Sequence, residues 1–162
     1  MSSSILSLMI WLPIFAGITL LLMGDNDKRP KNIIRYISFG ASLATFFLGV
    51  WLYLEFDNTT ASMQLIEKIV WIESLGIQYY LGVDGISVPL ILLTVFITPL
   101  VVMSSWDVIK LKPAQYFAAF LILEGLMIGV FSALDAILFY VFWEAMLVPM
   151  FLIIGIWGGQ RR

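Results

Sequence analysis

Five long apolar runs limit what this chain can fold into more than any other feature. They lie at about 5–23, 33–54, 86–104, 114–131 and 133–157. Each is close to the length of about 20 residues that lets a helix cross the hydrocarbon core of a bilayer. Since 61% of the 162 residues are hydrophobic and only 12% are charged, the apolar surface exceeds what a water-soluble domain can bury. The sequence predicts an all-α integral membrane protein with five transmembrane helices.

The connections between these runs are short except for one. The last two runs meet at a turn formed by Ser132 to Asp135, so they must be antiparallel neighbours. Ser132 followed by Asp135 fits a capping box with Asp in place of Glu. Asp84 and Asp135 are each also expected to cap the start of a helix. The long connection, 55–83, alternates weakly, which suits a short β-hairpin or an amphipathic interfacial helix. We expect one membrane domain over 1–162.

The basic residues are distributed unevenly between the two ends of the predicted helices. Eight of the nine Lys and Arg lie at one end, in 24–35, in 106–113 and at the C-terminus. Only Lys68 lies at the other end. By the positive-inside rule this split places the N-terminus in the periplasm and the C-terminus in the cytoplasm.

Composition excludes several kinds of chemistry. The chain has neither Cys nor His, so disulfides, thiolate metal sites and imidazole proton transfer are impossible. No Gly-rich phosphate loop and no nucleophile–base set is present. The net charge of −2 argues against a nucleic-acid partner. We expect no metal and no cofactor in this chain, and proton chemistry would depend on carboxylates, lysines or water.

Two carboxylates interrupt the apolar runs. Glu124 lies in the fourth run, and Glu144 in the fifth, within FYVFWEAMLVPM. An ionisable group at such depth is costly and by default marks a functional site. A rise of 1.5 Å per residue places both about 15 Å from the turn that joins the two helices, near the bilayer midplane. Helix rotation, which the sequence leaves open, decides whether they face each other; if they do, the pair could hold and release a proton.

Pro149 adds a second feature near Glu144. It cannot donate a hydrogen bond to the carbonyl of Ala145, and such breaks in membrane helices are satisfied by water or by neighbouring polar groups. We therefore expect a hydrated pocket beside Glu144.

Each glutamate also has a purely structural interpretation. Glu144 could be a protonated packing residue bonded to a backbone carbonyl of another helix. Glu124 could be a neutral acid sheltered at a close helix contact, which the small residues Gly125 and Gly129 favour.

Two segments carry a family resemblance. The stretch GVFSALDAILFYVFWEAMLVPMFLIIGIWGG, residues 129–159, resembles the fourth-to-fifth helix region of the antiporter-like subunits of respiratory complex I. It is most similar to the subunit M family of bacterial NADH–quinone oxidoreductase, the counterpart of mitochondrial subunit 4. LGVDGISVPLILLT, residues 81–94, resembles the start of that family's third helix.

The resemblance implies a proton-translocating membrane subunit that couples NADH oxidation by quinone to proton transport. Such a subunit is a non-redox part of the enzyme, with flavin, iron–sulfur clusters and quinone held by partner subunits. The expected partners are other membrane-arm subunits and the lipid bilayer. The expected location is the bacterial inner membrane, which the chain crosses several times.

The resemblance also implies residue roles. The family's fifth-helix glutamate, essential for proton transfer, falls on Glu144 and pairs with a lysine on a later helix. Glu124 matches an acidic position found in only some members and is a candidate relay partner. The family continues beyond Arg162, so the chain looks like the N-terminal part of a longer subunit. Alone it should not translocate protons, because the Glu–Lys relay is incomplete.

Two further interpretations remain open. The chain could belong to a multisubunit cation/proton antiporter or a membrane-bound hydrogenase, which share the Glu-bearing fifth helix. It could also be a structural membrane subunit without a relay role.

Overall fold

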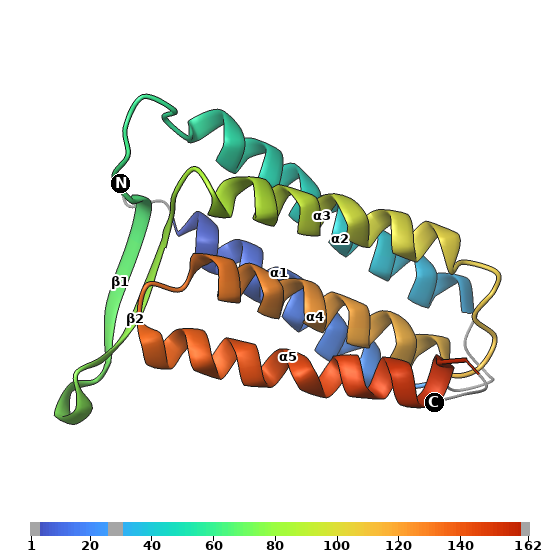
Figure 1. Ribbon diagram of the computed structural model, residues 1–162. Coiled ribbons are helices and arrows are strands. Elements are labelled where there is room, and N and C mark those ends of the chain that lie inside the picture. Colours follow the sequence, from blue (N-terminus) through green and yellow to red (C-terminus); the bar gives the residue numbers. More distant parts are fainter. Residues whose placement is uncertain (1–3, 26–30, 160–162) are drawn as a thin grey trace.

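The predicted membrane helices are present. The structure, a computed structural model, describes residues 4–25 and 31–159 (Figure 1). Its helices are α1 (Ile5–Met23), α2 (Lys31–Glu55), α3 (Ser87–Ser104), α4 (Pro113–Ser132) and α5 (Ala136–Trp157). All five are long and apolar enough to cross a membrane. This confirms the five-helix prediction, with bounds that differ by at most three residues.

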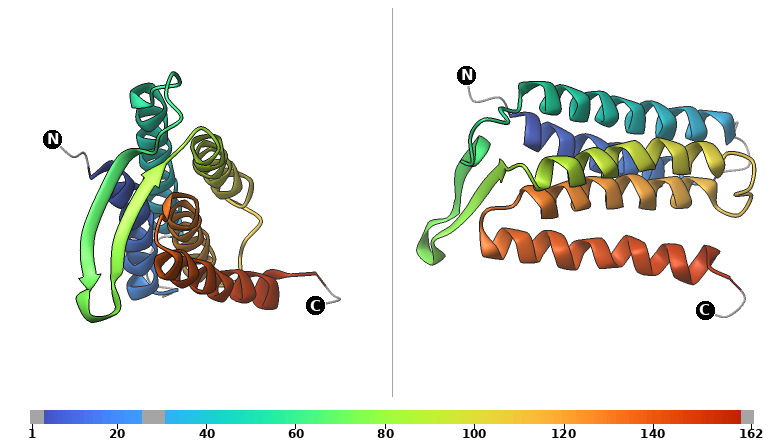
Figure 2. Two further views of the ribbon diagram at one scale, coloured as in Figure 1. Left: turned by 60° about the vertical axis from the view of Figure 1, so that its left-hand side comes forward. Right: turned by 45° about the horizontal axis from the view of Figure 1, so that its top comes forward.

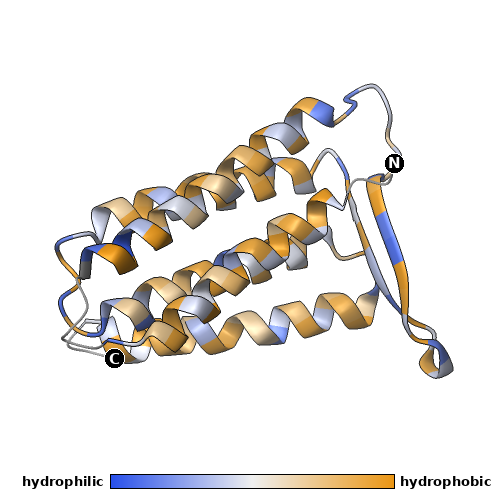
Figure 3. Ribbon diagram, turned by 180° about the vertical axis from the view of Figure 1, so that it is seen from behind, coloured by the Kyte–Doolittle hydropathy of each residue, from blue (hydrophilic) through white to orange (hydrophobic). Residues whose placement is uncertain are grey.

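The central helix of the bundle is α4. It packs against each of the other four helices, whereas α5 packs mainly on α4. Figure 2 shows α5 at the edge of the bundle, beside α4. Most of the surface of α5 is therefore left uncovered by the described residues. Figure 3 shows hydrophobic residues along the length of the helices. Many of their large apolar side chains are exposed, as expected for a protein in lipid.

Two glycines let α4 approach its neighbours closely. A Cβ added at Gly125 would collide with the backbone carbonyl of Ile10 on α1, and one at Gly129 would lie 2.8 Å from the ring of Phe142 on α5. Small residues at these positions permit tight packing of membrane helices. The helix contact that the sequence predicts at Gly125 and Gly129 is confirmed.

The long connection forms a β-hairpin, one of the two alternatives that the sequence left open. Its strands are β1 (Gln64–Ile72) and β2 (Ile77–Val83), joined by a short 3-10 turn, η1 (Glu73–Leu75). The strands pair antiparallel. The hairpin crosses the end of the bundle at which α1, α3 and α5 begin (Figures 1 and 2). Backbone hydrogen bonds fix it there, since the Leu134 N–H donates to the Tyr80 carbonyl at 2.8 Å.

The predicted caps at Asp84 and Asp135 are confirmed. Asp84 Oδ1 accepts from the N–H groups of Ile86 and Ser87, at 3.1 and 2.7 Å. These bonds, chiefly that from Ser87, lower the pKa of Asp84. The capping box with Ser132 is wrong, because Ser132 is the last residue of α4 and its hydroxyl donates back to the Ile128 carbonyl at 2.7 Å.

Asp135 acts alone as the N-cap of α5. Its Oδ1 accepts from Ile137 N–H at 2.9 Å and from Leu138 N–H at 3.1 Å. Its Oδ2 accepts from Gln78 N–H of the hairpin at 3.3 Å. The bond from Leu138 is the main cause that lowers the pKa of the Asp135 carboxyl. One side chain thus caps α5 and attaches the hairpin to it.

Two further helix starts are capped by carboxylates far away in the sequence. Glu67 of β1 accepts from Leu6 N–H at 2.8 Å and also from Ser7 N–H at the start of α1. Asp25 accepts from Ala114 N–H at 2.8 Å at the start of α4. Negative charge is favourable at a helix N-terminus, where N–H groups lack intrahelical partners. Acidic side chains outside the membrane helices therefore cap helix starts at both ends of the bundle.

Candidate functional site

Glu144 lies in the middle of α5 on the surface of the described structure. The phenol of Tyr140, one turn earlier, lies close enough to interact with its carboxylate. Tyr140 and Trp143 beside it are also exposed. The only ion pair among the described residues joins Arg35 to Asp107, so no described cation neutralises Glu144. The face of α5 that carries Glu144 is open to whatever covers it in the assembled protein.

The pocket near Pro149 differs from the predicted one. A pocket of about 530 Å³ separates parts of α4 and α5. Ala145 and Pro149 line it, but Glu144 does not. Its lining is apolar apart from Gln115 and the indole of Trp157, whose N–H already donates to the Leu111 carbonyl at 2.8 Å. The backbone break therefore adjoins an apolar pocket, and Glu144 points elsewhere.

Glu124 lies in a very different environment from Glu144. Only 1% of its surface is exposed. It lines a second cavity, of about 190 Å³, between α3 and α4, together with Thr94 and Thr98. Neither carboxyl oxygen has a hydrogen-bond partner among the described residues. Thr98 is close enough to interact with the carboxyl group, but its hydroxyl donates to the Thr94 carbonyl at 3.1 Å.

The structure does not bring Glu124 and Glu144 together. The side of α4 that faces α5 carries Ile122 and Leu126, which line the pocket beside Pro149. At 3.6 residues per turn, Glu124 lies about 200° around the helix from Ile122. Glu124 therefore faces α3, while Glu144 lies on the surface of α5. Helix rotation separates two side chains that the sequence places at the same depth.

Two residues near Glu124 were missed by sequence reasoning. Thr94 and Thr98 lie four residues apart in the third apolar run, which places both hydroxyls on one face of α3. Both are about 7% exposed, and with Glu124 they are the polar side chains among the described residues that line the cavity. Their i, i+4 spacing was the available signal, but it did not indicate which helix they face.

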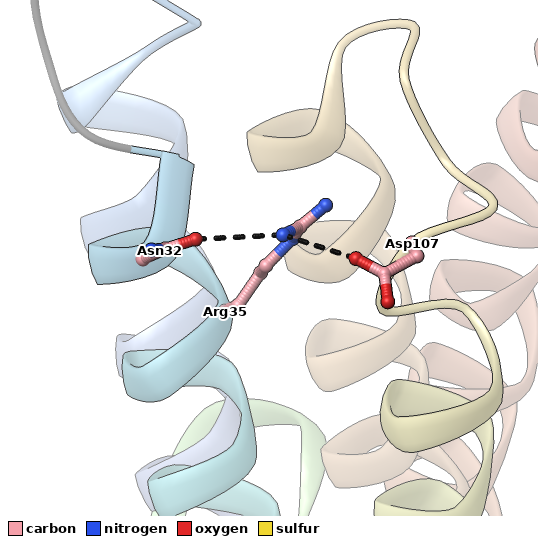
Figure 4. Close-up of polar contacts among 3 residues, drawn as sticks. All are labelled: Asn32, Arg35 and Asp107. Atoms are coloured by element: carbon pink, nitrogen blue, oxygen red, sulfur yellow. Dashed lines mark hydrogen bonds and ion pairs between the residues drawn. The ribbon is translucent and has the colours of Figure 1, made fainter.

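The basic end of the bundle carries a polar cluster of its own. Arg35 on α2 lies 3.5 Å from a carboxylate oxygen of Asp107 and 3.4 Å from the Asn32 side-chain oxygen. Figure 4 shows the guanidinium between the two. Its carbon also lies 6.0 Å from the ring centre of Trp106. These contacts join α2 to the loop after α3 and hold this cation far from the midplane.

Among the described residues, no group of three or more acidic side chains could hold a metal ion.

Comparisons with known proteins agree with this architecture. Residues 7–134 match the family described as NADH-ubiquinone oxidoreductase chain 4, amino terminus. The chain is 44% identical over 161 residues to NADH-quinone oxidoreductase subunit M of Rhodobacter capsulatus, covering 98% of this chain and 31% of the relative. It is 40% identical over 157 residues to F(420)H(2) dehydrogenase subunit M of Methanosarcina mazei, covering 96% of this chain and 30% of the relative.

A solved structure shows the same fold. The chain superposes with a TM-score of 0.72 and 28% identity on a chain of respiratory complex I from Thermus thermophilus with bound NADH, covering 96% of this chain and 30% of that one. It thus spans about a third of the length of the relatives that it matches. On the family match, the sequence identities and the fold, this chain belongs to the family of NADH-ubiquinone oxidoreductase chain 4, whose amino-terminal region it matches.

Proposed function

We propose that this chain forms the amino-terminal part of a proton-translocating membrane subunit of NADH–quinone oxidoreductase. The observation that carries the proposal is Glu144, a carboxylate halfway along a membrane helix of this family whose face the described residues leave open. An ionisable group at this depth in a membrane helix is costly and by default marks a functional site, such as a proton path. Glu144 has Tyr140 on its own helix as its neighbour.

The mechanism requires a cation from outside these residues. An isolated carboxylate in a bilayer is costly, and a cation within about 4–6 Å offsets that cost by favouring the charged form. A lysine supplied by a later helix would therefore let Glu144 release its proton, and movement of that cation away would let Glu144 take one up. The chain alone would supply the glutamate of the proton relay but not its lysine. Flavin, iron–sulfur clusters and quinone would be held by partner subunits, where NADH is oxidised.

The proposed partners and orientation follow from the ends of the bundle. Other membrane-arm subunits and lipid would cover the apolar surfaces of the helices. Lys110 and Lys112 lie in the loop between α3 and α4, at one end of the bundle, whereas Lys68 lies in the hairpin at the other. The positive-inside rule then supports a cytoplasmic loop and a periplasmic hairpin in a bacterial inner membrane.

A second electron donor is also compatible with this chain. The relative from Methanosarcina mazei is named an F(420)H(2) dehydrogenase subunit. Since no donor site is proposed for these helices, the proton role of Glu144 would be the same with either donor. Assay of membranes with NADH and with reduced F420 as alternative donors separates the two possibilities.

Substitution of Glu144 in the full-length subunit tests the function. We expect Glu144→Gln to lower the rate of coupled NADH oxidation by quinone at least about tenfold, because the amide cannot carry a proton. Glu144→Asp should retain part of the rate. Glu73→Gln, in the exposed turn of the hairpin, is a matched control that should behave as wild type. A wild-type rate for Glu144→Gln in a normally assembled complex would leave a purely structural role for this residue.

A further inference from the structure

Glu124 is the one buried carboxyl group among the described residues whose two oxygens both lack a hydrogen-bond partner. It is buried at the centre of α4, where no described side chain or backbone group bonds to either oxygen. Burying an ionised carboxylate without a partner is far more costly than burying a neutral acid. A neutral acid still has one O–H donor and acceptor positions to satisfy. Buried groups of this kind are usually bonded to protein or to ordered water.

The pocket beside Glu124 is large enough to hold water and carries a few polar groups in a mainly apolar lining. It opens at the surface of the described structure, where its lining residues Leu90, Leu93 and Ile97 are exposed. Its volume of about 190 Å³ exceeds the roughly 30 Å³ that one water molecule occupies in the liquid. A buried water also needs two to four polar partners. The cavity offers the carboxyl group and the hydroxyls of Thr94 and Thr98. The rest of its lining is apolar: Leu90, Leu93, Ile97, Val101, Phe120, Leu123, Met127 and Phe131.

The two threonines are arranged as acceptors. The Thr94 hydroxyl donates to the Leu90 carbonyl at 2.9 Å, and the Thr98 hydroxyl donates to the Thr94 carbonyl at 3.1 Å. Each hydroxyl oxygen keeps lone pairs free to accept a hydrogen bond. The side of α3 that lines the cavity therefore offers two hydrogen-bond acceptors, the hydroxyl oxygens of Thr94 and Thr98. A protonated Glu124 and water are donors of the right kind.

We propose that Glu124, Thr94 and Thr98 form a second proton-binding site, in which a protonated Glu124 exchanges its proton with water held in the cavity between α3 and α4. Of the side chains that the structure describes, no other titratable one lines this cavity. Proton transfer from Glu124 to a cavity water would leave a carboxylate and a hydronium ion, and the reverse step restores both neutral species. The site is occupied by water and a proton, without any other ligand.

The titratable groups on the elements around α4 lie outside this cavity. Among the described residues, α1 and α3 carry none within their helical bounds. Beyond Lys31 at its first position, the helix α2 carries Arg35, Tyr36, Tyr53 and Glu55. The helix α5 carries Tyr140 and Glu144, β2 carries Tyr79 and Tyr80, and α4 itself carries Tyr116. The cavity lining includes none of these described side chains. Glu124 is therefore the group whose proton the cavity water would exchange.

This site is separate from the one proposed at Glu144. The two carboxylates lie on different sides of α4, and Glu144 is absent from the cavity lining. The inference does not depend on the Glu144 relay, because it rests on the burial and surroundings of Glu124 alone. It assigns Glu124 to the α3 side of the bundle and not to a carboxylate pair.

Infrared spectroscopy of the assembled complex in lipid tests the inference. A protonated carboxyl group has a carbonyl-stretch band, and exchange of its proton for deuterium shifts that band to lower frequency. We expect a band of this kind that is lost in Glu124→Gln and shifts in D₂O. In Thr98→Val, which removes the hydroxyl and keeps the shape, the band should move to higher frequency. Thr98→Ser should restore it.

The controls separate this site from Glu144. Glu144→Gln should leave the Glu124 band in place, whatever it does to proton transport. If Glu124→Gln fails to assemble, the shift in Thr98→Val carries the test. A spectrum unchanged by Glu124→Gln in the assembled complex, a Glu124 band that does not respond to D₂O, or a band unchanged in Thr98→Val would overturn the inference.

Discussion

At the scale of single residues, three glutamates show how the surroundings set the role of one side chain. Glu67 accepts hydrogen bonds from backbone N–H groups, Glu124 has no described partner, and Glu144 is exposed on α5. The sequence alone placed Glu124 and Glu144 at the same depth, because depth follows from residue count. It could not place them around their helices, because α4 and α5 are apolar on nearly every side, and hydropathy does not indicate which side is buried.

The separation of Glu124 from Glu144 predicts that their substitutions act independently. Groups that share no partners usually give additive effects, within about 0.3–0.5 kcal/mol. We expect the activation-energy losses of Glu124→Gln and Glu144→Asp, measured as coupled oxidation rates, to add in the double variant. A strong deviation from additivity would indicate a shared site that the structure does not contain.

At the scale of elements, the hairpin is the part that sequence reasoning described least well. Its strands alternate only weakly, and its position depends on Glu67, whose partners lie about 60 residues away. Long-range backbone contacts of this kind leave no local signal in the sequence. The caps at Asp84 and Asp135 were predictable because each side chain bonds to N–H groups two and three residues later.

Removal of the Glu67 carboxylate should loosen the start of α1. Loss of a helix cap costs about 1 kcal/mol, so we expect Glu67→Ala to speed hydrogen exchange at Leu6 and Ser7 by roughly fivefold, as local opening becomes easier. Mass-spectrometric exchange on the assembled complex measures it. Glu73→Ala is the control and should leave these amides unchanged. Equal exchange in wild type and Glu67→Ala would show that the hairpin does not hold α1.

The cap at Asp135 should make the start of α5 sensitive to acid. Because the folded protein lowers the pKa of Asp135, the carboxylate stabilises the fold above the unfolded value of about 3.9. This stabilisation is lost as the pH falls through the folded value. We expect exchange at Leu138, corrected for the intrinsic pH effect, to accelerate below about pH 4. Asp135→Asn keeps an acceptor oxygen but cannot titrate, so exchange at Leu138 should no longer depend on pH in this range. An acid response in Asp135→Asn equal to that of the wild type would contradict the proposed role of the Asp135 carboxylate.

At the scale of the whole molecule, the apolar runs determine the bundle and the charges determine its orientation. Runs of about 20 apolar residues have few alternatives to a membrane helix, so the number of helices and their antiparallel order were predictable. The sequence could not predict that α4 is the central helix, because the position of a helix in the bundle depends on close contacts such as the one at Gly125. The open surface of α5 agrees with a chain that spans about a third of the length of its relatives.

The orientation gives a prediction for the complete subunit. A reporter fused after Lys112 should be cytoplasmic, and one inserted near Met63 should be periplasmic, because basic residues concentrate in cytoplasmic loops. Alkaline phosphatase is active only outside the cytoplasm and serves as the reporter. Activity after Lys112 together with inactivity near Met63 would reverse the orientation.

The proposal that Glu144 carries protons is tested most directly by counting them. The measurement is the number of protons moved into vesicles per NADH oxidised, by the complete complex carrying Glu144→Gln in this subunit. We expect assembly to be normal and the count to fall below that of the wild type, with Glu144→Asp between the two. A Glu144→Gln complex that moves the wild-type number of protons per NADH would contradict the proposed role of Glu144.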